Sequence, residues 1–388
     1  MGNKKYEKRA KEENPVLAIC YDFDKTLSPD DMQAQGYIQS VGYDVGAFWK
    51  ESNGLAEDND MDQNLAWMFK MKEKAQGQVL FTKEKLLEYG AKVSLFPGVE
   101  EWFERIRQYG AERKVKVEHY IISSGLKEMI EGTKVAQNGV FERIYASSFF
   151  YDHSGVAIWP AQVVNYTNKT QFLFRIKKGV LDSNDFDVND YFAPEDVRVP
   201  FQNMVYIGDS DTDIPCMKLV NANGGHSIGV YNSDKTKVHK MMRDGRIRYF
   251  VAADYTDGSE LDLLVKSIIE RTAANEVLEE KHFSCKRETN NADKENNEEL
   301  QRKLDLLISL ENSHSFARTH SVIASLSYYS NWSDAERHML LDIAIRNSQV
   351  RYILGDRDVK VFYEKILAKV DSRDPIAIEV KNIMNGSK

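Results

Sequence analysis

Short apolar runs alternate with amphipathic segments between residues 16 and 271 of the chain. The first run, Val16-Leu17-Ala18-Ile19-Cys20, is continuously apolar, which is typical of a strand buried on both faces of a parallel sheet. Further strands are predicted at residues 117–122, 143–147, 204–207, 227–231 and 247–251, with a β-hairpin over 149–159. Apolar residues at helical spacing predict helices at 99–109, at 167–178 and near 261–269. This alternation predicts an α/β fold built on a parallel sheet.

Two parts of the chain depart from this alternation. Residues 31–94 lack strong strand patterns, and helical spacing predicts a small helical insertion after the first strand. Beyond residue 300 the apolar positions again have helical spacing, and Ser333-Asp334-Ala335-Glu336 predicts a capping box that opens a helix ending at Gly355. The predicted domains are an α/β core (15–30 and 95–275), a helical insertion (31–94), a polar linker or solvated helix (276–299) and an all-α unit (300–388).

Composition narrows the classes of function. The 388 residues carry a formal net charge of −8, which argues against binding nucleic acid through its phosphates. No apolar run approaches the ~20 residues of a membrane span, and residues 1–11 are charged, unlike a secretory signal. The three cysteines are widely separated, as in proteins of a reducing compartment. We therefore expect a cytoplasmic protein with neither nucleic-acid nor membrane partners.

The stretch Tyr21-Asp22-Phe23-Asp24-Lys25-Thr26-Leu27 directly follows the first predicted strand. It brings two carboxylates, Asp22 and Asp24, to the carboxyl end of that strand, where open α/β sheets bind ligands. Two carboxylates this close repel each other when both are ionised, and a bound cation or a shared proton relieves the repulsion. The simpler interpretation of an Asp-x-Asp pair is a solvated polar turn, and the pair alone does not decide between the two.

Other strand ends also carry polar residues. Ser123 precedes a predicted helix start, an arrangement that can bind an anion, although an ordinary N-cap by Ser123 or Ser124 is the simpler explanation. Lys169 lies in the first turn of helix 167–178, where its charge opposes the helix dipole unless an anion is near. The simpler interpretation is a solvated surface lysine. The loop after strand 204–207 carries three carboxylates, Asp209, Asp211 and Asp213.

In order, strand context and residue type, four motifs together resemble the haloacid dehalogenase (HAD) superfamily of phosphohydrolases. They are Asp22-Phe23-Asp24-Lys25-Thr26, Ile122-Ser123-Ser124-Gly125, Lys169-Thr170-Gln171-Phe172-Leu173 and Gly208-Asp209-Ser210-Asp211-Thr212-Asp213. The resemblance spans residues 15–271 and is greatest to the phosphoserine-phosphatase-like branch. It implies a Rossmann-like HAD fold with a helical cap inserted after the first strand, and it does not extend to the helical C-terminal unit. The acidic insert at 181–200 lengthens the gap between the last two motifs, so Lys177 and Lys178 are rivals to Lys169.

The resemblance implies a Mg²⁺-dependent phosphatase that hydrolyses a small phosphorylated metabolite. Asp22 would attack phosphorus and form an aspartyl-phosphate, and Asp24 would serve first as the acid and then as the base. The presence of Asp24 favours a phosphatase or mutase over the dehalogenases, which lack this acid, and the ion-pumping ATPases, which replace it with threonine. The implied Mg²⁺ ligands are Asp22, Asp24 through its backbone carbonyl, Asp209 and Asp213; the implied phosphate-binding residues are Ser123 and Lys169.

Two alternatives share the same residues. A phosphotransferase or phosphomutase would pass the phosphoryl group to an acceptor other than water. Alternatively, the helical C-terminal unit is a sensing or interaction module that binds a protein partner; its simpler roles are to pack on the core or to form a homo-oligomer. Four residues of the insertion are candidate substrate contacts that sequence does not distinguish from packing residues: Asp31, Gln33, Tyr37 and Trp67.

Overall fold

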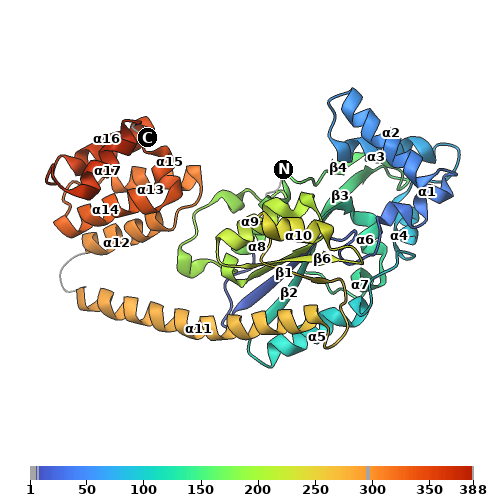
Figure 1. Ribbon diagram of the computed structural model, residues 1–388, viewed down its shortest axis with the longest axis horizontal. Coiled ribbons are helices and arrows are strands. Elements are labelled where there is room, and N and C mark those ends of the chain that lie inside the picture. Colours follow the sequence, from blue (N-terminus) through green and yellow to red (C-terminus); the bar gives the residue numbers. More distant parts are fainter. Residues whose placement is uncertain (1–5, 7, 294–297, 387–388) are drawn as a thin grey trace. The chain divides into compact units, whose positions relative to one another are not determined.

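The computed structural model describes residues 6, 8–293 and 298–386 of the chain (Figure 1). Its contacts divide the protein into two compact units: unit 1 comprises Met1–Asp190 and Asp196–Leu278, and unit 2 comprises Tyr191–Glu195 and Glu279–Lys388. Within the described residues, no helix combines the length and the apolar composition needed to cross a bilayer. The α/β fold with a helical insertion and an all-α C-terminal unit is confirmed.

A seven-stranded sheet forms the centre of unit 1, with the strand order β4-β3-β2-β1-β5-β6-β7. The strands are β1 (Val16–Tyr21), β2 (Lys116–Leu126), β3 (Arg143–Tyr151), β4 (Ala157–Gln162), β5 (Met204–Gly208), β6 (His226–Tyr231) and β7 (Tyr249–Ala252). All neighbouring strands are parallel except β3 and β4, which form the predicted antiparallel hairpin.

The register of this sheet brings the predicted site residues to one edge. Strand β1 lies between β2 and β5, and its last residue, Tyr21, is level with Ile121 of β2 and Ile207 of β5. Strands β1 and β5 therefore end within one residue of each other, and β2 runs on beyond them to Leu126. Because parallel strands share one carboxyl edge, the polar residues that follow them lie close together.

Alternate residues of β1 face two separate hydrophobic cores. Leu17, Ile19 and Tyr21 join the core on the side of α5 (Val99–Ala111) and α11 (Glu260–Asp293). Val16, Ala18 and Cys20 join the core on the side of α8 (Lys169–Lys178), α9 (Ile214–Ala222) and α10 (Thr236–Arg243). Figure 1 shows these helices covering opposite faces of the sheet. A strand with both faces covered needs apolar residues throughout, which explains the unbroken apolar run.

The insertion after β1 is helical, as predicted. Its elements are the 3₁₀ turn η1 (Met32–Ala34) and the helices α1 (Tyr37–Ser40), α2 (Val45–Asp58), α3 (Gln63–Ala75) and α4 (Lys83–Gly90). Helix α4 packs closely on the core helix α6 (Lys127–Gly132), which is followed by α7 (Lys134–Gln137). A Cβ atom on Gly90 would lie 1.9 Å from the carbonyl oxygen of Met129, so only glycine permits this approach.

The hairpin of β3 and β4 also holds the insertion in place. The N–H of Lys83 donates to the carbonyl oxygen of Gly155 at 3.0 Å, and the N–H of Ala157 donates to that of Phe81 at 2.9 Å. Closer to the sheet, the side-chain amide of Asn64 donates to the carbonyl oxygen of Val164 at 2.6 Å. The insertion is thus anchored to the core at both ends of the hairpin.

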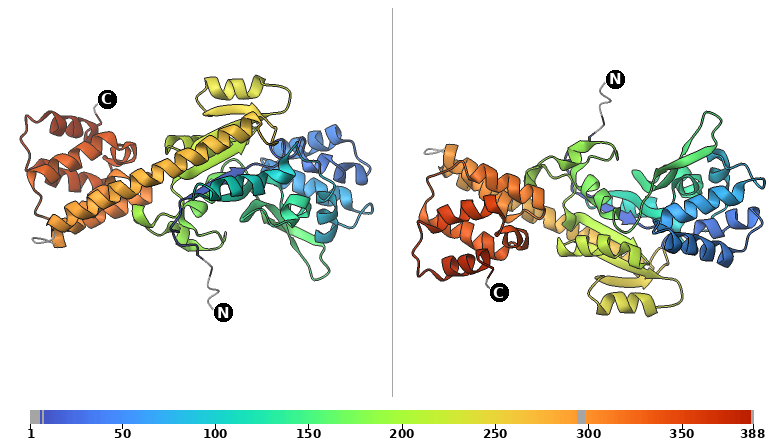
Figure 2. Two further views of the ribbon diagram at one scale, coloured as in Figure 1. Left: turned by 90° about the horizontal axis from the view of Figure 1, so that it is seen from below. Right: turned by 90° about the horizontal axis from the view of Figure 1, so that it is seen from above.

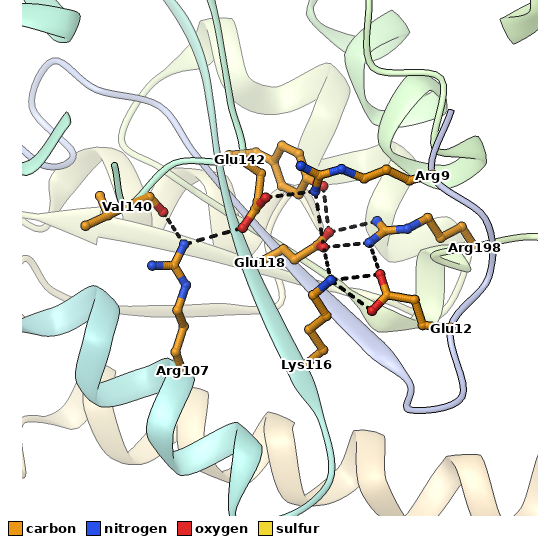
Figure 3. A network of polar contacts seen from close by, with 9 residues as sticks. Arg9, Glu12, Arg107, Lys116, Glu118, Val140, Glu142 and Arg198 are labelled. Carbon is orange, nitrogen blue, oxygen red and sulfur yellow. Dashed lines mark hydrogen bonds and ion pairs between the residues drawn. The ribbon is translucent and has the colours of Figure 1, made fainter. Parts of the chain in front are cut away.

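An ion-pair network lies near the amino end of β2, away from the carboxyl edge (Figure 3). The carboxylate of Glu118 is fully buried and accepts hydrogen bonds from Arg198 at 2.5 and 2.8 Å and from Tyr120 at 2.7 Å. Glu12 of the N-terminal segment pairs with both Arg198 and Lys116. The network therefore joins β2 to two segments without regular secondary structure.

Unit 2 has a hydrophobic core of its own. Its helices are α12 (Glu298–Glu311), α13 (Phe316–Leu326), α14 (Asp334–Arg346), α15 (Ser348–Ile353), α16 (Arg357–Leu367) and α17 (Pro375–Met384). The predicted capping box is confirmed, with Ser333 and Glu336 each bonding the other's backbone N–H. The predicted continuous helix to Gly355 is wrong, because it breaks at Asn347, whose side-chain amide bonds the carbonyl oxygens of Glu311 and Ser313.

The polar segment 276–299 was predicted as either a linker or a solvated helix. Up to Asp293 it is helical and continues α11, which is a single unbroken helix of 34 residues (Figure 2). Residues 294–297 of the segment lie outside the described residues.

Candidate active site

Asp22 is held at the carboxyl edge of β1 by the neighbouring strand. Its backbone N–H donates to the carbonyl oxygen of Ile207 at 2.9 Å, which extends the pairing of β1 with β5 by one residue. The chain then turns sharply, and the N–H groups of Thr26, Leu27 and Ser28 all donate to the carbonyl oxygen of Phe23. The side chain of Asp22 is therefore fixed in a buried position at the start of the turn.

Asp24 does not point the same way as Asp22 into the cluster described below. Its Oδ1 accepts a hydrogen bond from the N–H of Met32, the first residue of η1, at 2.8 Å. A Cβ on Gly125 would lie 2.9 Å from Oδ2 of Asp24 and 3.3 Å from Oγ of Ser123. The carboxylate of Asp24 and the hydroxyl of Ser123 thus converge on Gly125, which gives them room.

Ser123 is not the cap of a helix. Strand β2 continues to Leu126, four residues beyond the predicted end at Ile122, and α6 starts at Lys127 without a side-chain cap. The hydroxyl oxygen of Ser123 instead accepts the N–H of Gly125 at 3.0 Å. The simpler N-cap explanation therefore does not hold, and the buried hydroxyl lies on the side of Gly125 that Asp24 also faces.

Lys169 connects two of the carboxylates. This lysine is the first residue of α8 and is fully buried, and its Nζ donates to Oδ1 of Asp22 at 3.1 Å and to Oδ1 of Asp213 at 2.8 Å. A buried ammonium group is stable only when carboxylates or other acceptors surround it. The unfavourable charge at the start of α8 is therefore compensated by acids from two other loops.

The side chains of Asp22, Asp209 and Asp213 form an acidic cluster. One carboxylate oxygen from each lies within 4.8 Å of the others, close enough for the three to share one divalent cation. Mg²⁺ and Ca²⁺ prefer oxygen ligands of this kind. The chemistry of these donors therefore fits the predicted metal, and the loop 208–213 supplies two of the three.

Burial and mutual repulsion raise the pKa values of the carboxyl groups, so this site favours binding of protons or of a cation. Burial, and then the charge of Asp213, raise the pKa of Asp22 to about 6. Burial, and then Asp213 and Asp22, raise the pKa of Asp209 to about 7. Burial, followed by Asp31 and Asp22, raises the pKa of Asp24 well above its usual value. A carboxyl group with a raised pKa is suited to donating a proton near neutral pH.

Lys169 keeps its positive charge although its side chain is buried. Burial alone would lower the pKa of its ammonium group, but Asp213 and then Asp22 raise that pKa above the usual value for lysine. The site therefore contains one buried cation among three acids that are buried or largely buried.

Two residues at this site were not predicted from the sequence. Tyr206 of β5 donates its hydroxyl to Oδ1 of Asp213 at 2.9 Å, and it escaped notice because it belongs to an apolar strand. Lys237 lies with its Nζ 3.7 Å from Oδ2 of Asp209. The sequence did indicate a position for Lys237, because this lysine follows the predicted strand 227–231, and that strand ends at the same edge of the sheet.

The rival lysines lie elsewhere. Lys178, at the end of α8, donates to the carbonyl oxygens of Val188 and Asp190 at 2.6 Å, so it fastens the acidic insert. Lys177 lies over the ring of Phe201. Asp211 is exposed on its loop, as expected for a solvated turn residue.

The four candidate substrate contacts of the insertion differ in the partners that their side chains have. Tyr37 and Trp67 are buried and bonded within the insertion, to the carbonyl oxygen of Met71 and the side chain of Asn64. Asp31 instead pairs with Lys25 at 2.7 Å. Gln33 is buried, and its side-chain oxygen has no hydrogen-bond partner among the described residues.

A family model for haloacid dehalogenase-like hydrolases matches residues 19–218, which is more than half of the chain and includes all the residues of the acidic cluster. The chain therefore belongs to the haloacid dehalogenase-like hydrolase family of enzymes, as the four motifs predicted.

A curated relative is an uncharacterized protein from Borreliella burgdorferi, 26% identical over 280 residues, which cover 64% of this chain and 95% of that protein. Several solved structures are similar at low identity. A HAD-family hydrolase from Salmonella enterica serovar Typhi has a TM-score of 0.45 at 16% identity, covering 66% of this chain and 73% of its own. A probable phosphoserine phosphatase from Vibrio cholerae also has a TM-score of 0.45, at 14% identity, covering 68% and 67%. Cytosolic 5'-nucleotidase IIIB bound to cytidine has a TM-score of 0.41 at 14% identity, covering 68% and 87%.

Proposed function

We propose that the protein is a Mg²⁺-dependent phosphomonoester hydrolase that works through an aspartyl-phosphate on Asp22. The observation that carries this proposal is the position of the Asp22 carboxylate, which lies 3.1 Å from the ammonium of Lys169 and within 4.8 Å of the carboxylates of Asp209 and Asp213. A phosphoryl group placed there would meet a nucleophile, a fixed cation and a metal site together.

In the first step an oxygen of Asp22 attacks phosphorus and the bond from phosphorus to the ester oxygen breaks. The leaving oxygen takes a proton from Asp24, whose raised pKa keeps that proton available. In the second step water attacks the aspartyl-phosphate, and Asp24, now ionised, accepts a proton from the water. Inorganic phosphate leaves, and Asp22 and Asp24 return to their starting states.

The other residues stabilise the charge of the transferred group. The ammonium of Lys169 and the hydroxyl of Ser123 would bind its oxygens. Asp22, Asp209 and Asp213, with the backbone carbonyl of Asp24, would hold Mg²⁺, which neutralises the crowded carboxylates and the phosphoryl oxygens. The insertion begins at η1, whose Met32 donates to Asp24, so a substrate beside Asp22 and Asp24 would be enclosed by the insertion and the sheet edge. That enclosure favours a small phosphorylated metabolite over a macromolecule.

The test is release of phosphate from 4-nitrophenyl phosphate by the full-length protein in Mg²⁺. The variant Asp22→Asn should lose at least about 10³-fold in kcat, because the amide is a poor nucleophile. Asp211→Asn changes the same residue type at an exposed position and should keep near wild-type activity. Equal turnover by Asp22→Asn and the wild type would rule out the mechanism.

Isotope-labelled water separates hydrolysis from transfer. In ¹⁸O-labelled water the released phosphate should carry the label, because water opens the aspartyl-phosphate. Unlabelled phosphate, or a phosphorylated acceptor in its place, would identify a transferase instead.

A further inference from the structure

One cation at the edge of this site lies outside the four motifs. Lys237 is on α10, which follows β6, the strand next to β5 in the sheet. Its Nζ is 3.7 Å from Oδ2 of Asp209, and its side chain is 47% exposed. Within the described part of the chain it forms no second ion pair. The lysine is therefore loosely held and close to solvent, unlike the fully buried Lys169.

A second lysine belongs to the turn that follows β1. Lys25 directly follows Asp24 and has a φ of 59°, a left-handed conformation that is uncommon for residues other than glycine and is often found at functional sites. Its Nζ is 2.7 Å from Oδ2 of Asp31.

The contacts of Lys237 and Lys25 are with Asp209 and Asp31 and not with the proposed nucleophile. Lys169 contacts Asp22 directly and is already placed beside the point of attack. A divalent cation bound to Asp209 would neutralise the carboxylate charge that Lys237 otherwise balances. It would also repel the ammonium group of Lys237. Lys237 would then be a mobile cation at the rim of the site without a partner in the protein, and its flexible stem allows it to reach a bound substrate.

We propose that the substrate carries a second anionic group, a carboxylate or a further phosphate, and that Lys237 binds this group. This inference rests on the proposed phosphatase function and adds the charge of the substrate to it. Lys237 is a specificity residue in this proposal, since it contacts the part of the substrate that does not react.

The test compares two substrates of equal shape, 4-carboxyphenyl phosphate and its neutral amide, 4-carbamoylphenyl phosphate, with the full-length protein in Mg²⁺. The wild type should prefer the carboxylate by about tenfold or more in kcat/KM, as expected for one charge-assisted contact. Lys237→Ala should reduce that preference to within about twofold, because kcat/KM should fall much more for the carboxylate substrate than for the amide. Lys237→Glu should reverse the preference, because it places a negative charge beside the carboxylate.

Lys240→Ala is the matched control, because it removes the same charge from an exposed position three residues along the same helix. This variant should keep the wild-type preference. Lys25→Ala should lower the preference for the carboxylate by a smaller factor than Lys237→Ala, since Lys25 is already paired with Asp31.

Binding gives a second readout that does not depend on turnover. Calorimetry with two compounds that are not hydrolysed, 4-carboxybenzylphosphonate and 4-carbamoylbenzylphosphonate, should show the same preference in Kd and the same loss in Lys237→Ala. If the wild type binds and hydrolyses both members of each pair equally well, the inference is wrong and the phosphatase function stands.

Two other outcomes are also decisive. An equal loss of turnover on both substrates in Lys237→Ala would assign Lys237 to the metal or to the transferred phosphoryl group, and would overturn the inference. If neither substrate is hydrolysed in Mg²⁺, the proposed function fails, whereas the ratio of phosphonate affinities still shows whether Lys237 selects an anionic group.

Discussion

The ammonium group of Lys169 lies 3.1 Å from Oδ1 of Asp22, although the two positions are 147 apart in the chain. Lys169 also bonds Asp213, so one buried cation holds two loops of the site together. Without it, only hydrogen bonds such as that from Tyr206 to Asp213, protons or a metal ion would offset the charges of Asp22 and Asp213. This arrangement gives Lys169 a structural role as well as the proposed role in binding phosphate.

Lys169→Met keeps the length of the side chain and removes its charge. We expect phosphatase activity to fall by about 10²–10³-fold, since a fixed cation near the transferred group is lost. Without metal, the variant should unfold at a lower temperature than the wild type, and the difference should be larger at pH 8 than at pH 5.5, where protonation relieves the repulsion. Phosphate release and thermal denaturation in EDTA measure the two effects.

Lys177→Met is the control for that variant, because it removes a lysine from the other end of the same helix. It should keep wild-type activity. Loss of activity in Lys177→Met with none in Lys169→Met would mean that the wrong lysine has been assigned.

Stabilisation by Mg²⁺ should depend on pH. The pKa values of Asp22 and Asp209 are raised to about 6 and about 7 in the absence of metal, above the ~4 of a free aspartate. In the metal-free protein these two carboxyl groups contribute their full stabilisation only below the pKa that aspartate has in the unfolded chain, where both are protonated. That contribution is lost as pH rises through about 6 to 7, the pKa values in the folded protein. Mg²⁺ requires the ionised form, so protons compete with it at low pH. The increase in melting temperature caused by Mg²⁺ should therefore grow from pH 5 to pH 8.

Melting curves in MgCl₂ and in EDTA, recorded across that pH range, provide the measurement. Asp209→Asn should show a smaller increase with Mg²⁺ at every pH, since it removes one ligand. An increase that is the same at pH 5 and pH 8 in the wild type would contradict the assignment of these carboxylates as metal ligands.

The Glu118 network should make stability sensitive to acid. Burial would raise the pKa of Glu118, but its hydrogen bonds and ion pair with Arg198 outweigh burial and lower that pKa to about 2. A lowered pKa contributes stability that is present above the unfolded pKa of roughly 4.3 and is lost as pH falls towards 2. Glu118→Gln should destabilise the protein by about 3 kcal/mol near pH 7, because Arg198 is left buried with less compensation.

Urea denaturation at pH 7 and at pH 3 measures this effect. The difference between the wild type and Glu118→Gln should shrink at pH 3, where the wild type has lost part of the same contribution. Glu142→Gln removes a more exposed member of the network and should cost less than about 1 kcal/mol. A constant difference at both pH values would mean that the charge of Glu118 does not stabilise the fold.

The contact between α4 and α6 should tolerate no side chain at Gly90. In Gly90→Ala the new methyl group would clash with the backbone of Met129, so helix α4 must shift and the protein should lose about 1–3 kcal/mol of stability. Because α4 belongs to the insertion whose first turn bonds Asp24, kcat/KM for an aryl phosphate should fall as well. Urea denaturation and steady-state kinetics on the same samples test both effects.

Gly54→Ala provides the opposite control. Gly54 lies within α2 and a Cβ there would meet nothing within 4 Å, so alanine should stabilise the helix by about 0.4–1 kcal/mol. If both alanine variants have the same stability, the close contact at Gly90 does not exist in solution.

Local patterns were sufficient to predict most of the fold. The period of apolar residues identified the strands, because a strand covered on both faces must be apolar throughout, as β1 is. Since parallel strands end at one edge, the polar residues after β1 and β5 were expected to meet, and Asp22, Asp209 and Asp213 do form one cluster. The capping box of Ser333 was equally predictable, because its partners are three residues apart.

Contacts between distant parts of the chain decided the rest. Lys169 and Lys178 lie on one helix, and only the packing of α8 against the sheet separates the lysine at Asp22 from the one that fastens the acidic insert. The helix break at Asn347 depends on carbonyl groups of a different helix and the segment after it. The hydroxyl of Tyr206 finds its acceptor, Asp213, only after β5 and the following loop have folded. A short-range pattern is enough to predict a strand or a helix cap, because the residues that form it are close in the sequence. The partner of a buried polar group, in contrast, is determined by distant segments of the chain that pack over it.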